Sequence, residues 1–140
     1  MKKNNLIQTS KRIIIKIGSA LLIDKEKRTL RKKWLETLAI DIFKLIRLNK
    51  EVIIVSSGSI ALGKKQLSLK NNLTLDDTPA AAATGQISLA HAWKEVMLEH
   101  GLNVAQILLA PDDTETRRKH LNARATLIKL LELGVIPVIN

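Results

Sequence analysis

Apolar positions along the chain fall into two kinds of block, short continuous runs and longer periodic stretches. The short runs lie at 12–17, 52–55, 104–109 and 135–140, and most of their residues are Ile, Val or Leu. Continuous β-branched runs of this length are typical of strands buried on both faces of a parallel sheet. The pattern therefore predicts four strands.

Between these runs, residues 31–49, 78–100 and 115–133 show the period of an α-helix, and a shorter helix is expected up to about Leu67. Apolar side chains recur on one face of each long helix: Leu35, Leu38, Ala39, Ile42, Phe43 and Ile46; Leu89, Trp93, Val96 and Met97; Leu121, Ala125, Ile128 and Leu131. Strands that alternate with helices predict an α/β fold, with a mostly parallel sheet between helices.

Local signals set the limits of these elements. Thr78 and Pro79 fit the N-cap and first position of the second long helix, and Gly101 and Gly134 fit helix ends. The first strand is expected to continue briefly at 21–23, before a charged loop at 24–33. A polar loop is expected at 68–77, and Pro111–Thr114 is expected to turn out of the third strand.

Two strand ends carry candidate chemistry. The run at 52–55 leads through Ser56, Ser57 and Gly58 into a helix, a turn in which Ser56 or Ser57 can cap the helix start. Unpaired N–H groups and the helix dipole favour an anion there. A capped turn without a ligand is the alternative, since many α/β proteins contain one.

The first strand ends in a second turn, at Gly18 and Ser19, and Lys16 interrupts its apolar run. A buried lysine needs a partner, and an anion held at the glycine turn would supply one. The alternative is an edge-strand lysine that points to water. Two such turns, one with a lysine and one with serines, suit phosphoryl transfer, which needs positioning and positive charge. Neither turn is a Walker A loop.

Composition narrows the class of protein. The chain has 140 residues, no cysteine, and 2% aromatic residues, so its length suits one domain with an aliphatic core. Nothing indicates disulfides, a signal peptide or a membrane span, and a cytoplasmic location is expected. The net charge of +10 lies almost wholly in residues 1–33, which carry a net +9. With so few aromatics, a solvated basic segment is expected there, and nucleic acid is not an expected partner.

Other candidate groups have simpler explanations. His91, His100 and His120 lack metal-ligand spacing and suit solvated helix positions. Asp112, Asp113 and Glu115 could hold Mg²⁺ but also suit a helix N-terminus. Asn122 and Arg124 suit a surface or subunit contact. Ser57 does not lie in a GxSxG motif, so it is not expected to be a hydrolase nucleophile.

Five segments follow one another in a distinctive order and spacing: KIGS at 16–19, VSSGSIA at 55–61, AAAATGQ at 80–86, LNARATL at 121–127 and IPVIN at 136–140. In these segments the chain resembles the glutamate 5-kinases of the amino acid kinase superfamily. The resemblance extends over nearly the whole chain from Arg12. Thr84 and Ser59 depart from it slightly, because a small apolar residue and alanine are common at these positions in the family.

The resemblance implies a three-layer αβα sandwich that uses ATP and Mg²⁺ to phosphorylate the side-chain carboxylate of L-glutamate. The product would be glutamyl 5-phosphate, in the first step of proline biosynthesis. Lys16 would steady the transferred phosphoryl group, with Gly18 and Ser19 at the ATP phosphates. Ser57 and Gly58 would bind glutamate. No metal ligand is assigned to the chain, and a homo-oligomer is expected for a complete enzyme.

Members of that family continue past the strand at 135–140 into substrate and nucleotide loops, and some end in an RNA-binding-like module. The chain is therefore expected to be a truncated, N-terminal part, with a basic segment at 1–11 and half of a kinase domain at 12–140. Alone, it is expected to be inactive and poorly soluble or oligomeric, with the last strand at an unpaired edge. A related kinase of acetylglutamate, carbamate or a nucleotide, or a non-catalytic remnant, remain alternatives.

Overall fold

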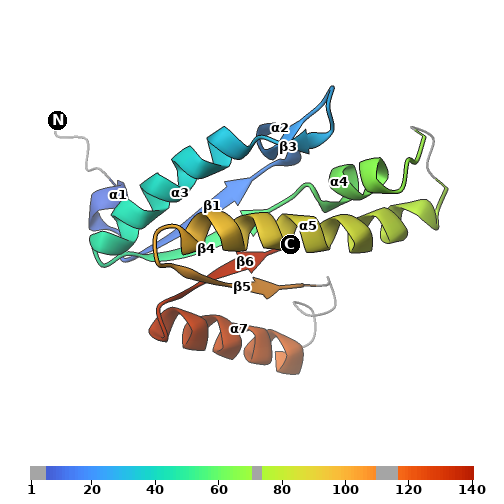
Figure 1. Ribbon diagram of the computed structural model, residues 1–140. Helices are drawn as coiled ribbons and strands as arrows, with labels where there is room; N and C mark the ends of the chain where they lie inside the picture. Colours follow the sequence, from blue (N-terminus) through green and yellow to red (C-terminus); the bar gives the residue numbers. More distant parts are fainter. Residues whose placement is uncertain (1–5, 71–73, 110–116) are drawn as a thin grey trace.

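The computed structural model describes residues 6–70, 74–109 and 117–140. Its main sheet has four parallel strands in the order β1-β4-β6-β5 (Figure 1). The strands are β1 (Arg12–Ile17), β4 (Glu51–Ser56), β6 (Val135–Ile139) and β5 (Asn103–Ile107). All four predicted strands are confirmed, with ends that differ by at most two residues.

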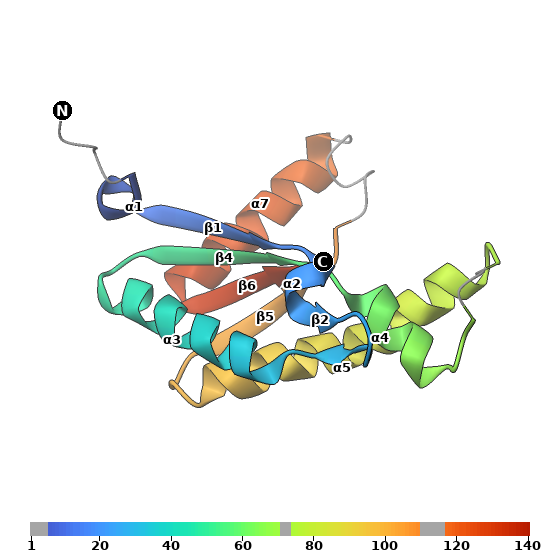
Figure 2. The same cartoon turned by 90° about the horizontal axis from the view of Figure 1, so that it is seen from above.

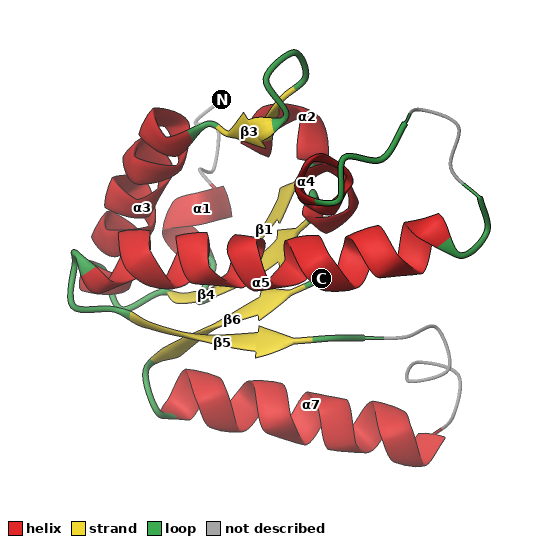
Figure 3. Ribbon diagram, turned by 45° about the vertical axis from the view of Figure 1, so that its right-hand side comes forward, coloured by secondary structure: helices red, strands yellow, loops and turns green. Residues whose placement is uncertain are grey.

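Helices cover both faces of the sheet. Figure 3 shows α3 (Lys32–Arg47) and α5 (Asp77–Leu98) on one side of the strands and α7 (Arg117–Glu132) on the other. The predicted three-layer αβα arrangement is confirmed. No helix in the described part of the chain is both long and apolar enough to cross a lipid bilayer.

The main core lies between the sheet and the α3/α5 layer. The apolar faces predicted for these two helices are confirmed, with Leu35 and Ile42 of α3 and Leu89 and Met97 of α5 buried against the strands. Burying an aliphatic side chain of this size contributes about 1.5–3 kcal/mol. This layer therefore provides most of the driving force for folding.

On the other face, α7 is only partly covered, and the face predicted for it is half wrong. Ile128 and Leu131 are half-buried as expected, but Leu121 and Ala125 are exposed. Among the described elements, α7 packs mainly against β6. The apolar residues of α7 form two overlapping stripes, and this contact covers only one of them.

After β1 the chain does not continue as a strand. Residues 19–22 form the short helix α2 (Ser19–Leu22), and the expected loop contains a hairpin of β2 (Ile23–Asp24) and β3 (Thr29–Leu30). The turn brings Leu22 and Ile23 into the core, where both are buried. Asp24 Oδ1 accepts hydrogen bonds from the backbone N–H groups of Glu26 and Lys27, at 3.0 and 2.9 Å, which fixes the tip of the hairpin.

Two helix starts differ from the prediction. The helix α4 (Ser59–Gln66) begins after Gly58, and α5 begins at Asp77, before Thr78 and Pro79. The N-cap of α5 is Asp76, and its side chain makes no cap hydrogen bond. Just before it, the Thr74 backbone N–H donates to Asp77 Oδ2 at 2.7 Å, and Thr74 Oγ1 accepts from Asp77 N–H at 3.3 Å. This reciprocal pair holds the turn that leads into α5, and Thr78 is not the cap.

The last strand is not at an edge, contrary to expectation. β6 pairs with β4 on one side and β5 on the other, and Ile136 and Val138 are buried. The edges of the sheet are β1 and β5. Figure 2 shows the carboxyl ends of the strands meeting α2, α4 and the C-terminal residue. Pro111–Thr114, Asp112, Asp113 and Glu115 lie outside the described residues.

Candidate functional site

A cavity of about 400 Å³ opens at the carboxyl edge of the sheet. Its described lining comes from the ends of β1, β4 and β6 and from the first turns of α4: Ser19, Ser57, Gly58, Ser59, Ile60, Ala61, Lys64 and Asn140. Open α/β sheets bind ligands at this edge, because loops from several strands converge there. The structure therefore brings Ser19, Ser57 and Gly58 to the same cavity. We call this space the carboxyl-edge cavity.

The backbone of the serine turn is set by Gly58, whose φ of +119° is in the range that favours glycine. Gly58 is the N-cap of α4, and no side chain caps this helix. The expectation that Ser56 or Ser57 caps α4 is therefore wrong. Ser56 is buried and its Oγ accepts a hydrogen bond of 3.1 Å from Trp93 Nε1, whereas Ser57 is exposed. Ser57 is thus left available to a ligand.

Two glycines bring α4 and α5 into backbone contact behind the serine turn. A Cβ atom on Gly63 would lie 1.8 Å from the carbonyl oxygen of Ala81, and one on Gly85 would lie 1.8 Å from that of Ser59. Neither position can hold a larger residue unless the helices separate. This crossing fixes α5 against the first turn of α4, and with it the cavity wall.

The structure does not bury Lys16, although the prediction of an anion partner assumed that it is buried. β1 is an edge strand, and Lys16 is exposed on the sheet face opposite α3 and α5. It needs no buried partner, so that part of the argument is wrong, and its placement matches the edge-strand alternative. Lys16 and Gly18 are not among the lining residues of the carboxyl-edge cavity. Gly18 has an extended backbone, and a Cβ there would meet no heavy atom within 4 Å.

The structure adds two residues that the turn patterns missed. Lys64 follows Ile60 by one helical turn of α4, so both reach the same cavity. Asn140 follows β6 directly, and its Nδ2 donates to Ser59 Oγ at 3.2 Å and to Gln86 Oε1 of α5. The position of Lys64, one helical turn after Ile60, could have been predicted from the sequence. The contact between Gln86 and Asn140 could not, because it depends on how α5 crosses the sheet.

The described lining is rich in hydrogen-bond donors and contains no carboxylate. It offers hydroxyl groups, the first N–H groups of α4 and the half-buried Lys64 ammonium. Such a set suits the oxygens of a carboxylate or a phosphoryl group. Among the described residues there is no group of three or more His, Cys, Asp or Glu that could hold a metal ion. The described lining therefore has the donors that an anion needs, and we assign none of the described residues to magnesium.

A neighbouring cavity of about 230 Å³ extends from Ser19 and Lys64 toward the β2/β3 hairpin. Asp24 lies on its wall beside Lys25 and Arg28. The hydrogen bond from the Lys27 backbone N–H, with a further one from Glu26, lowers the pKa of Asp24 below its usual value. One oxygen of its carboxylate, Oδ1, holds the hairpin through both hydrogen bonds.

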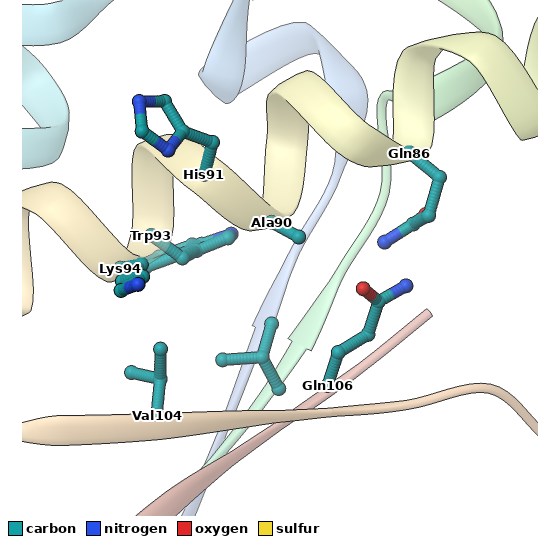
Figure 4. A pocket seen from close by; sticks show the side chains of 8 residues that line it. Gln86, Ala90, His91, Trp93, Lys94, Val104 and Gln106 are labelled. Carbon is teal, nitrogen blue, oxygen red and sulfur yellow. The ribbon is translucent and has the colours of Figure 1, made fainter.

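A third cavity, also of about 230 Å³, lies between α5 and β5 on the α3/α5 side of the sheet. Figure 4 shows Gln86 of α5 and Gln106 of β5 pointing toward each other across it, while the His91 ring points away. His91 Nε2 lies 3.2 Å from Glu95 Oε1, and His100 stacks on Phe43 with ring centroids 5.4 Å apart. His120, Asn122 and Arg124 are exposed on α7.

Comparison with known families shows to which family the chain belongs. Residues 11–140 match the model of the amino acid kinase family. The chain belongs to the amino acid kinase family. Its fold is also that of isopentenyl phosphate kinases: a crystal structure of the T. acidophilum isopentenyl phosphate kinase product complex matches 93% of this chain and 54% of its own, with a TM-score of 0.60 and 16% identity.

Within the family, the chain is similar to curated glutamate 5-kinases. It is 52% identical to that of Paramagnetospirillum magneticum over 134 residues, which is 96% of this chain and 36% of the relative. It is 56% identical to that of Rhodospirillum rubrum over 128 residues, which is 91% of this chain and 34% of the relative. The chain thus spans about a third of the length of the curated relatives it matches.

Proposed function

We propose that this chain supplies the glutamate-binding and phosphoryl-binding edge of a glutamate 5-kinase. The reaction would transfer the γ-phosphoryl group of ATP to the side-chain carboxylate of L-glutamate, as the first step of proline biosynthesis. The observation that carries the proposal is the convergence of Ser19, Ser57 and Gly58 on one donor-rich cavity. The similarity to glutamate 5-kinases along nearly the whole chain supports it.

In the proposed reaction a carboxylate oxygen of glutamate attacks the γ-phosphorus, and the bond from that phosphorus to the β–γ bridging oxygen breaks. Glutamyl 5-phosphate and ADP result. Reactions of this type need alignment and charge stabilisation, and little covalent participation by the protein. The Ser57 hydroxyl and the backbone at Gly58 would hold glutamate, while Gly18, Ser19 and the ammonium of Lys16 would face the phosphates. Magnesium accompanies ATP in the proposal, and it has no assigned ligand here.

Two features of the chain support this division of roles. Gly18 adopts a conformation open to any residue and has no neighbour at the position of a Cβ, so folding does not explain a glycine there. A phosphate that approaches the backbone closely would explain it. Lys16 is exposed two residues before Gly18, so its flexible side chain can follow the transferred group. A cytoplasmic location and a homo-oligomeric state belong to the same proposal.

The test is the effect of Ser57→Ala on the two substrates. Glutamate-dependent ADP formation would be measured with the chain alone and with it joined to the remaining length of a relative. Loss of a substrate hydrogen bond should raise the KM for glutamate roughly tenfold and leave that for ATP nearly unchanged. Equal effects on both constants would argue against a role for Ser57 in glutamate binding. Faster turnover of N-acetyl-L-glutamate than of L-glutamate would favour a related kinase.

A further inference from the structure

The side chain of Asn140 is tied at the carboxyl-edge cavity by two hydrogen bonds. Its Nδ2 donates to Ser59 Oγ at 3.2 Å and to Gln86 Oε1. A primary amide has two N–H donors, and acceptors of the chain itself use both. The carbonyl oxygen Oδ1 is therefore the polar atom of Asn140 that remains for a ligand.

Both acceptors are held in place by packing. Ser59 is buried at the start of α4, and Gln86 is half-buried on α5. Gln86 follows Gly85, the residue at which α5 touches the backbone of Ser59. Since that contact leaves no room for a Cβ, Gln86 cannot move along the helix axis without breaking the crossing. The direction of the Asn140 amide is thus set by the fold.

The rest of the described cavity lining gives that oxygen a distinct role. The hydroxyls of Ser19 and Ser57, the N–H groups at the start of α4 and the Lys64 ammonium all suit anionic oxygens. Asn140 is the one described lining residue with a side-chain carbonyl, and no Asp or Glu side chain is among the described lining. A ligand that carries an ammonium group as well as carboxylates needs an acceptor, and Asn140 Oδ1 provides one.

We propose that Gln86 is a positioning residue that turns the Asn140 amide so that its Oδ1 accepts a hydrogen bond from the ammonium group of an amino-acid substrate. The inference rests on the proposed glutamate-binding function and deepens it, because it assigns the group that recognises the α-amino end. It also makes Gln86 a determinant of specificity, although the Gln86 side chain acts only through Asn140.

The experiment compares L-glutamate with glutarate, which has the same two carboxylates and lacks the ammonium group. Binding of each to the purified chain would be measured by NMR titration for wild type, Gln86→Met and Gln86→Glu. Gln86→Met should lower the affinity for L-glutamate roughly tenfold, because a hydrogen bond to a charged group is lost, and should change the affinity for glutarate less than twofold. Gln86→Glu should retain the preference for L-glutamate, since a carboxylate still accepts from Nδ2.

Gln106→Met is the matched control, because Gln106 faces Gln86 across the cavity of Figure 4 and lies on the neighbouring strand. It should change neither affinity. An equal loss for both ligands in Gln86→Met, or no loss for L-glutamate, would overturn the inference and leave glutamate binding intact. A wild-type chain that binds glutarate and not L-glutamate would overturn it as well.

A second readout needs no ligand. The side-chain amide protons of Asn140 should be protected from solvent exchange in wild type and in Gln106→Met, and lose this protection in Gln86→Met. Rapid exchange in the wild type would overturn the positioning role even if glutamate binds. Protection without any binding of L-glutamate would instead refute the proposed function and, with it, the assignment of Oδ1 to an ammonium group, while the Gln86–Asn140 contact would stand.

Discussion

Gly63 and Gly85 show how single residues decide the shape of the site. At each, an added Cβ would lie 1.8 Å from a backbone carbonyl oxygen of the facing helix. Backbone atoms inside a helix cannot move aside as a flexible side chain can, so the helices themselves would have to separate. Gly18 is the opposite case, because space around it is open and its backbone is extended.

Gly85→Ala should therefore destabilise the fold, and Gly18→Ala should not. Overpacking of this kind costs about 1–3 kcal/mol or more, whereas a substitution in open space changes the free energy of unfolding by about 0.5 kcal/mol at most. Urea titration followed by circular dichroism measures both values. Similar stabilities for the two variants would show that α4 and α5 are not in backbone contact.

Lys16→Ala should impair catalysis and leave the stability of the fold unchanged. Lys16 is exposed, so its removal should leave the free energy of unfolding within about 0.5 kcal/mol of wild type. Loss of a positive charge that acts on the transferred phosphoryl group should lower kcat by about two to three orders of magnitude. Steady-state kinetics of the chain joined to the rest of a relative measures this, with exposed Lys33→Ala as the control. Near-normal turnover would remove Lys16 from the proposed site.

The site was partly predictable at this scale. Ser19, Ser57 and Gly58 follow strand ends, and the carboxyl ends of parallel strands meet at one edge whatever the details of the fold. The hydrogen bonds of Ser56 and Asn140 were not predictable, because their partners Trp93 and Gln86 lie on a helix whose rotation and depth depend on the crossing at Gly85. No local pattern encodes that crossing.

Among the elements, α5 best shows why boundaries are harder to predict than helices. Its apolar face was correctly predicted, because Leu89, Trp93 and Met97 repeat at helical spacing and are buried. Its start was not, since Pro79 suggested a first helical position at the proline. The helix begins at Asp77, two residues before Pro79, after a turn held by the Thr74–Asp77 pair. Pro79 is tolerated in the first turn of the helix, where a backbone N–H has no helical partner.

The Thr74–Asp77 pair should make the start of α5 sensitive to acid. The backbone N–H of Thr74, with its hydroxyl second, lowers the pKa of Asp77 below the ordinary value of 3.8. A carboxyl whose folded-state pKa is depressed stabilises the fold above its unfolded-state pKa, and this contribution is lost as pH falls through the folded-state pKa. Stability from Asp77 should thus be complete above about pH 5 and decline below about pH 4.

The measurement is the melting temperature of wild type and Asp77→Asn from about pH 7 to about pH 2.5. The difference between the two proteins should shrink as the solution becomes more acidic, because Asn cannot titrate. If the difference in melting temperature stays constant with pH, the Asp77 carboxylate does not stabilise the start of α5.

For the whole molecule, the order of the strands in the sheet could not be predicted from the sequence. Alternating strands and helices indicated a parallel sheet, but periodicity does not say which strands are neighbours. The last strand was expected at an edge and lies between β4 and β5. On the edge strand β1, one large apolar residue is open to solvent: Ile14 is 63% exposed on the face away from α3 and α5. An isoleucine on an open sheet face is a candidate contact for association.

We expect the chain to self-associate through this face of β1. Ile14→Lys should weaken association at least tenfold, because each protein would lose a buried isoleucine and gain a repelling charge. Circular dichroism should remain unchanged, since the side chain contributes little to the core. Sedimentation velocity across a range of concentrations measures the effect, with Leu75→Lys, at a residue 95% exposed, as the control. If Leu75→Lys and Ile14→Lys act alike, the β1 face is not the contact.

The central claim is that the carboxyl-edge cavity binds glutamate, and an NMR titration of the ¹⁵N-labelled chain with L-glutamate tests it most directly. The account predicts saturable shifts that cluster at the described lining residues, above all Ser19, Ser57, Gly58 and Asn140. Ser57→Ala should weaken the response at all of these positions. The absence of shifts there, or shifts confined to the cavity between α5 and β5 around Ala90 and Val104, would contradict the account.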